Sequence, residues 1–130
     1  MAFYVDTSAL VKLVVGESET AALRAWLEEP GRELVACDLA RTELMRAVRR
    51  AVPDRVLQAR EVLDVVTLVH VTPAVFEAAG RLDPSGLRSL DAIHLAAALD
   101  LGDDLDGLIT YDDRLADAAV SNGVAVVAPR

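Results

Sequence analysis

The chain has 130 residues, of which 53% are hydrophobic and 26% charged, which excludes wholesale disorder and predicts a single globular domain over residues 1–130. One cysteine, Cys37, and two histidines exclude a disulfide framework and leave little room for a Cys- or His-based metal cage. The net charge of −8 by itself argues against a nucleic-acid partner.

No segment has the length of a membrane-spanning helix, and the N-terminus lacks the basic start of a signal peptide. Cys37 lies in the apolar stretch 34–37 and is interpreted as a buried strand residue rather than a reactive thiol. A free cysteine fits a reducing compartment. We therefore expect a cytoplasmic protein with no membrane partner.

Short apolar runs alternate with longer helical patterns, without internal repeats. A strand at 3–5 meets a helix at Asp6-Thr7-Ser8, whose side chains favour turns and N-caps. A helix from Ser18 ends at Pro30-Gly31, a strand follows at 33–37, and Asp38 is expected to cap a helix that runs to about residue 51. The further elements expected are helices at 54–65, 74–82, 88–101 and 112–120, and strands at 67–71, 107–110 and 124–127.

Five strands interleaved with helices, several of them apolar on both faces, predict a parallel sheet covered on both sides, which is a three-layer α/β domain. In such folds the working site lies outside the carboxyl ends of the strands. The places to search are therefore just after Val5, near the start of the helix after Cys37, and just after Ile109.

Two carboxylates occupy such places. Asp6 directly follows the first strand, and Asp112 follows the strand that ends at Thr110. Each of them could instead serve only as a helix N-cap, for which Asp is a preferred residue.

Two further carboxylates lie within helical patterns. Glu43 stands among apolar neighbours, and Asp91 lies in the nearly uncharged stretch 90–98, where an unpaired carboxylate would be costly to bury. A salt bridge to Arg88 is the structural interpretation of Asp91, and a metal ligand is the functional one. Carboxylates converging at one end of the sheet would need a cation, and oxygen-only ligands select Mg²⁺ or Mn²⁺. Such ions serve phosphodiester hydrolysis, so the chemistry points to a nuclease or phosphatase.

The positive charge is unevenly distributed. Residues 41–60 carry six arginines against two carboxylates, a net charge of +4, so the rest of the chain carries −12. Arginine offers a planar fork suited to phosphate or carboxylate. The cluster could be a solvated helix face, a phosphate-contacting face or a dock for an acidic peptide.

Four segments together resemble one family in order and approximate spacing: Asp6-Thr7-Ser8-Ala9-Leu10, Arg41-Thr42-Glu43-Leu44, Leu90-Asp91-Ala92-Ile93-His94-Leu95-Ala96 and Thr110-Tyr111-Asp112. The chain resembles the PIN-domain ribonucleases, and most of all the VapC-type toxins of VapBC (type II) toxin–antitoxin pairs. The resemblance implies a five-stranded parallel sheet in the order 3-2-1-4-5. It also implies metal-dependent endonucleolytic cleavage of RNA at an acidic site that binds Mg²⁺ or, as a substitute, Mn²⁺.

Carried over residue by residue, the resemblance assigns the catalytic, metal-binding positions to Asp6, Glu43, Asp91 and Asp112. Asp6 and Asp91 are expected to bind the first ion directly, while Glu43 and Asp112 complete the site. The supporting positions implied by the resemblance are Ser8 and Thr110, with Asp113 as a competitor for the role of Asp112. The Thr-x-Asp spacing favours Asp112.

The resemblance also implies partners: an RNA substrate, a second copy of the chain in a homodimer, and a VapB-type antitoxin. The antitoxin's C-terminal segment would cover the acidic site, often with an Arg in it. His94 is interpreted as a helix histidine that supports Asp91 or the sheet rather than a proton-transfer group.

Other function classes fit less well. A receiver-like domain needs an acidic pair after the first strand and a late lysine, but Asp6 stands alone and the sole lysine is Lys12. A haloacid-dehalogenase-type phosphatase needs Asp where this chain has Ser8. The alternative that remains is a PIN fold that binds RNA or protein without turnover.

Overall fold

The computed structural model describes residues 2–130, so the domain predicted over 1–130 includes one residue, Met1, that lies outside the described residues. Its centre is a sheet of five strands: β1 (Ala2–Val5), β2 (Glu33–Cys37), β3 (Thr67–Val69), β4 (Leu105–Ile109) and β5 (Val126–Val127). The strand order is β3-β2-β1-β4-β5, and each neighbouring pair is parallel. The predicted order and direction of the strands are confirmed.

Helices connect the strands, as parallel pairing requires. They are α1 (Thr7–Val14), α2 (Thr20–Leu27), α3 (Leu39–Ala51), α4 (Val56–Val65), α5 (Pro73–Gly80), α6 (Ser89–Leu99) and α7 (Asp113–Ser121). Two single turns of 3₁₀ helix, η1 (Pro53–Arg55) and η2 (Gly102–Asp104), precede α4 and β4. Within the described residues, no helix is long and apolar enough to cross a membrane.

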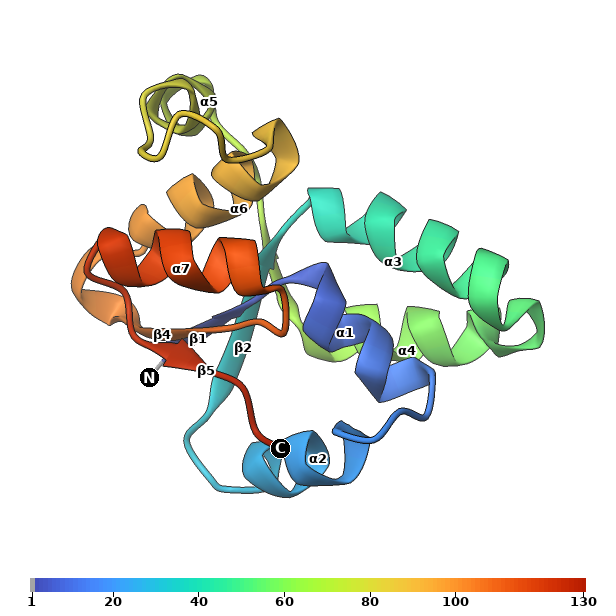
Figure 1. Cartoon of the computed structure of the whole chain (residues 1–130). Coiled ribbons are helices and arrows are strands. Elements are labelled where there is room, and N and C mark those ends of the chain that lie inside the picture. The colour runs from blue at the N-terminus through green and yellow to red at the C-terminus, as the bar shows by residue number, and fades with distance from the viewer. Residues whose placement is uncertain (1) are drawn as a thin grey trace.

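The sheet separates two hydrophobic clusters, because successive side chains of a strand point to opposite faces. In β1, Tyr4 belongs to the cluster covered by α5, α6 and α7, while Val5 belongs to the one covered by α1 to α4. Figure 1 shows these two groups of helices on either side of the strands. Cys37 is fully buried, as predicted. The predicted three-layer architecture is confirmed.

The differences from the predicted elements lie at their ends. The helix predicted from residue 54 begins with the 3₁₀ turn η1, and the last strand shortens to two residues. The strand predicted over 67–71 ends at Val69, because strand pairing with β2 ends at Cys37.

Asp38 occupies the N-cap position of α3, as predicted, but it does not cap the helix through its carboxylate. The side chain of Asp38 makes no capping hydrogen bond at the start of α3. Its carboxylate instead accepts hydrogen bonds from Arg41 at 3.1 Å and His70 at 2.6 Å. The hydrogen bond from His70 and, to a lesser extent, the one from Arg41 hold the pKa of Asp38 below its usual range.

Candidate active site

The four predicted carboxylates lie near the starts of four helices. Asp6 and Asp112 are the N-cap residues of α1 and α7, Asp91 is in the first turn of α6, and Glu43 is in the second turn of α3. Figure 1 shows the first turns of these helices facing the same region, beyond the carboxyl ends of the central strands. This is the edge of the sheet that the sequence predicts for the site.

Asp6 is the most buried of the four, with 5% of its surface exposed. Its Oδ1 accepts hydrogen bonds from the Ser8 hydroxyl at 2.6 Å and the Ala9 amide at 3.3 Å, and its Oδ2 accepts one from the Thr110 hydroxyl at 2.8 Å. Burial raises the pKa of Asp6 although these hydrogen bonds oppose the shift. Asp6 is thus both a helix cap and a buried carboxylate at the strand ends.

The hydroxyls of Ser8 and Thr110 join the start of α1 to the end of β4. The amide of Tyr111 donates to Ser8 Oγ at 3.0 Å, and the amide of Asp112 donates to Thr110 Oγ1 at 3.1 Å. These contacts fix the two hydroxyls around Asp6. Their part in a reaction stays a prediction.

Glu43 is held by a network that reaches the sheet. Its Oε1 lies 2.5 Å from Nε2 of His94 and accepts a hydrogen bond from the Thr7 hydroxyl at 3.0 Å. The other ring nitrogen of His94 lies 2.8 Å from the Tyr4 hydroxyl, which accepts a hydrogen bond from the Cys37 amide at 3.0 Å. His94 supports the sheet, as predicted, through its contact with Tyr4 of β1. The carboxylate that it supports is Glu43, whereas the sequence suggested Asp91.

Tyr4 and Thr7 are parts of the site that were not predicted from the sequence. Tyr4 is fully buried. Its place in a core strand could have indicated its role, because a buried tyrosine normally needs a hydrogen-bond partner for its hydroxyl.

Electrostatics make His94 a cation. Burial alone would lower the pKa of His94, but its hydrogen bonds to Cys37 and Glu43 and the charge of Glu43 outweigh this effect and raise the pKa to about 10. Burial likewise favours neutral Glu43, but the hydrogen bond from His94 and its charge lower the pKa of that carboxyl. The two side chains therefore form a charged pair at neutral pH.

Asp91 is half-buried and makes no ion pair with Arg88, so the structural interpretation of Asp91 as one half of that salt bridge is wrong. Burial and the nearby charge of Asp112 raise the pKa of Asp91, and Glu43 adds to the shift, while His94 and Arg88 oppose it. A like charge raises the pKa of a carboxyl only when it lies near that carboxyl. The fold therefore brings Asp91, Asp112 and Glu43 into one electrostatic neighbourhood.

Asp112 and Asp113 differ in their surroundings. Asp112 is partly buried and caps α7 by accepting hydrogen bonds from the amides of Arg114 at 2.9 Å and Leu115 at 3.1 Å. Asp113 is exposed and begins the helix. The charge felt by Asp91 is that of Asp112, which favours Asp112 for the fourth acidic position.

The donor chemistry fits a hard divalent cation, although residues 2–130 contain no group of three or more Asp, Glu, His or Cys side chains already arranged to hold one. Carboxylate oxygens of Asp6, Glu43 and Asp112 accept hydrogen bonds from within the chain. All four candidates offer oxygen ligands, which Mg²⁺ and Mn²⁺ prefer. Burial and, after it, the charge of Asp112 raise the pKa of Asp91, and a bound cation would favour the charged form of that carboxyl.

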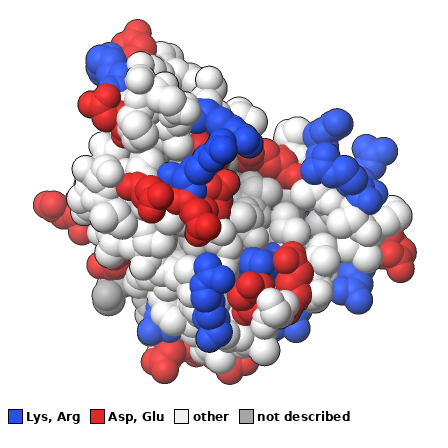
Figure 2. Space-filling view, viewed as in Figure 1, with Lys and Arg blue, Asp and Glu red and all other residues white. Residues whose placement is uncertain are grey.

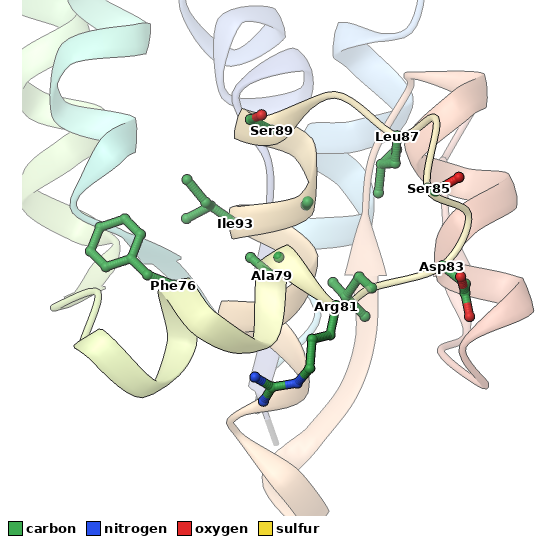
Figure 3. A pocket seen from close by; sticks show the side chains of 11 residues that line it. Phe76, Ala79, Arg81, Asp83, Ser85, Leu87, Ser89 and Ile93 are labelled. Carbon is green, nitrogen blue, oxygen red and sulfur yellow. The ribbon is translucent and has the colours of Figure 1, made fainter.

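A hollow of about 390 Å³ lies elsewhere, beside α5, α6 and the loop that joins them. Figure 3 shows Phe76 and Ile93 on one side of it and Asp83 and Ser85 on the other. None of the four candidate carboxylates lines it. This hollow is therefore separate from the acidic site.

Comparison with known proteins agrees with the fold. The family model of the PIN domain matches residues 3–121. Ribonuclease VapC46 of Mycobacterium tuberculosis (strain ATCC 25618 / H37Rv) is 47% identical over 128 residues, which are 98% of each chain.

Two solved structures share the fold. The M. tuberculosis VapC20 structure, described as a sarcin-ricin loop cleaving toxin, has a TM-score of 0.77 at 21% identity and covers 98% of this chain and 99% of its own. A toxin–antitoxin complex from Klebsiella pneumoniae has a TM-score of 0.72 at 24% identity and covers 98% of both chains.

Proposed function

The chain belongs to the PIN-domain family, in its VapC branch, and we propose that it is an endoribonuclease that acts as the toxin of a toxin–antitoxin pair. The near full-length similarity to a protein named as a ribonuclease supports the reaction class. The observation that carries the proposal is the neighbourhood of Asp91, whose pKa is raised by burial and by Asp112 and Glu43. Carboxylates that lie together at strand ends can bind the metal ions that assist phosphodiester hydrolysis.

The metal proposed for the site is Mg²⁺, with Mn²⁺ as a substitute. Asp6 and Asp91 would bind it directly, and Glu43 and Asp112 would complete the site. When bound, such an ion neutralises the scissile phosphate, lowers the pKa of a bound water and stabilises the leaving oxygen.

The residues of the chain hold these carboxylates in place. Ser8 and Thr110 orient Asp6 by donating to different oxygens of its carboxylate. His94 and Thr7 orient Glu43. The role assigned to Glu43 and Asp112 is to orient the attacking water. Side chains whose rotation is already restricted suit this role, because preorganised groups lose little free energy on reaching the transition state.

The proposed partners are an RNA substrate, a second copy of the chain and a VapB-type antitoxin. The Klebsiella neighbour is itself a toxin–antitoxin complex, which supports a protein inhibitor for this fold. An antitoxin arginine placed among the carboxylates would form charge-assisted hydrogen bonds in place of the metal. Such a contact would inhibit cleavage by direct competition.

Cleavage of total cellular RNA by the purified, antitoxin-free protein tests the proposal. The assay is run with Mg²⁺, with Mn²⁺ and with EDTA, beside an Asp91→Asn variant. We expect discrete products that require metal, and a loss of roughly a hundredfold or more in rate for Asp91→Asn. Absence of cleavage by folded protein with either metal would favour the alternative, a PIN fold that binds RNA or protein without turnover.

A further inference from the structure

Three arginines on α3, Arg46, Arg49 and Arg50, form a surface that the acidic site does not use. All three are exposed, and together they line a shallow hollow of about 270 Å³. Within residues 2–130 none of them forms a salt bridge. Figure 2 shows a group of blue side chains on the right of the view with no red side chain among them. We call these three residues the arginine cluster.

The lack of carboxylate partners is informative because acidic residues outnumber basic ones, 21 to 13. Some other cations of the chain are paired or packed: Lys12 contacts Glu17 and Glu19, and Arg32 lies over the Trp26 ring at 3.9 Å. The arginine cluster instead keeps three guanidinium forks together in spite of their mutual repulsion. A polyanionic ligand would relieve that repulsion.

The cluster begins one helical turn from the candidate site. Glu43, Arg46 and Arg50 follow one another at spacings of three and four residues, so they share one stripe of α3. With a rise of about 1.5 Å per residue, Arg46 lies about 4.5 Å and Arg50 about 10.5 Å further along the helix axis than Glu43. The stripe therefore leads from the acidic site outward.

We propose that the arginine cluster binds the phosphates of the RNA strand next to the phosphate that is cleaved, and so guides the strand into the acidic site. This inference rests on the proposed ribonuclease function. The remainder of the chain carries a net charge that repels RNA, so a strand needs a local positive surface that leads to the carboxylates. Arginine forks bind phosphate oxygens in pairs, which suits a backbone contact without base specificity.

Salt-dependent binding tests the inference without cleavage. A fluorescently labelled, mixed-sequence single-stranded RNA is titrated with the full-length Asp91→Asn protein across a series of NaCl concentrations. The test variant adds Arg46→Gln and Arg50→Gln. The matched control adds Arg60→Gln and Arg81→Gln, which remove the same charge from two exposed arginines outside the cluster.

We expect the slope of log affinity against log salt to fall by about 0.7 for each lost phosphate contact in the test variant. The control should keep the slope of the Asp91→Asn protein. Equal slopes for test and control would overturn the inference. So would a test variant that loses binding to polyglutamate but keeps its RNA slope, because the cluster would then serve an acidic protein.

Failure of the proposed function has a different signature. In that case the protein with Asp91 intact does not cleave RNA under either metal, while the binding slopes of the test and control variants can still differ. The cleavage and binding assays thus report separately on the two proposals.

Discussion

His94 links the candidate site to the sheet through both nitrogens of its ring. One nitrogen contacts Glu43 and the other contacts Tyr4, whose hydroxyl is fixed by the Cys37 amide. Each member of this chain of contacts restricts the next, so the orientation of the Glu43 carboxylate depends on a buried strand residue. His94 is therefore a positioning residue, which acts on the reaction through Glu43.

Replacing His94 tests this role. His94→Gln should weaken the apparent affinity for Mn²⁺ or slow cleavage by 10- to 100-fold, as is typical when a residue that supports a metal ligand is removed. The affinity is measured by calorimetry on protein shown to be folded. The matched control is His70→Gln, which alters the exposed second histidine. A His94→Gln protein that is less stable but has unchanged Mn²⁺ affinity and cleavage rate would show that the residue is only structural.

Two of the helices that surround the site begin with a capping carboxylate. Asp6 caps α1 and Asp112 caps α7 with side-chain hydrogen bonds, so these carboxylates satisfy amides that would otherwise lack partners. The same side chains are the candidate ligands. Capping and function are therefore not alternatives here, because a carboxylate has two oxygens and several lone pairs.

A cap outside the site gives a clean test of helix energetics. Thr72 caps α5, its hydroxyl accepting a hydrogen bond from the Val75 amide at 3.3 Å. Thr72→Ala should lower the free energy of unfolding by about 1 kcal/mol, and Thr72→Ser should restore most of it. Urea denaturation measures both. RNA cleavage should be unchanged, since α5 contributes none of the four carboxylates. Equal stability of Thr72→Ala and the parent would mean that this cap is replaced by water.

At the scale of the whole molecule, the acidic site lowers the stability of the folded protein when no cation balances its charge. The chain carries a net charge of −8, and two of the candidate carboxylates, Asp6 and Asp91, have raised pKa values in which burial is the largest cause. A raised pKa means that the folded protein binds these protons more tightly than the unfolded chain. The contribution of Asp6 and Asp91 to the stability of the metal-free protein must therefore fall as the pH rises above about 4, where the unfolded carboxyls ionise.

Asp6→Asn should remove part of this penalty. In EDTA the variant should be more stable than the parent, and the difference should be larger at pH 7.5 than at pH 5. Added Mg²⁺ should stabilise the parent, by about 2.7 kcal/mol at a concentration a hundred times its Kd, and should have little effect on the variant. Thermal and urea unfolding at the two pH values measure these effects. A parent that Mg²⁺ does not stabilise would contradict the proposed metal site.

The sequence by itself was sufficient to predict the architecture of the fold. Short apolar runs between helical patterns predicted parallel strands, and the similarity of four motifs to PIN-domain ribonucleases predicted their order, which the structure confirms. This works because the periodicity of apolar residues and the need to bury both faces of a parallel sheet are local properties of the chain. The ends of elements were less predictable, since β3 and β5 stop where their neighbours stop pairing.

The partners of individual side chains were decided only by the tertiary structure. Sequence spacing pairs Asp91 with Arg88 or His94, but in the fold His94 contacts Glu43, 51 residues away, and Tyr4, 90 residues away. Likewise, the hydroxyl of Thr110 reaches Asp6 across 104 residues. Motifs therefore predict which residues gather at the sheet edge, whereas the hydrogen bonds and charges among them depend on contacts between distant segments that spacing does not encode.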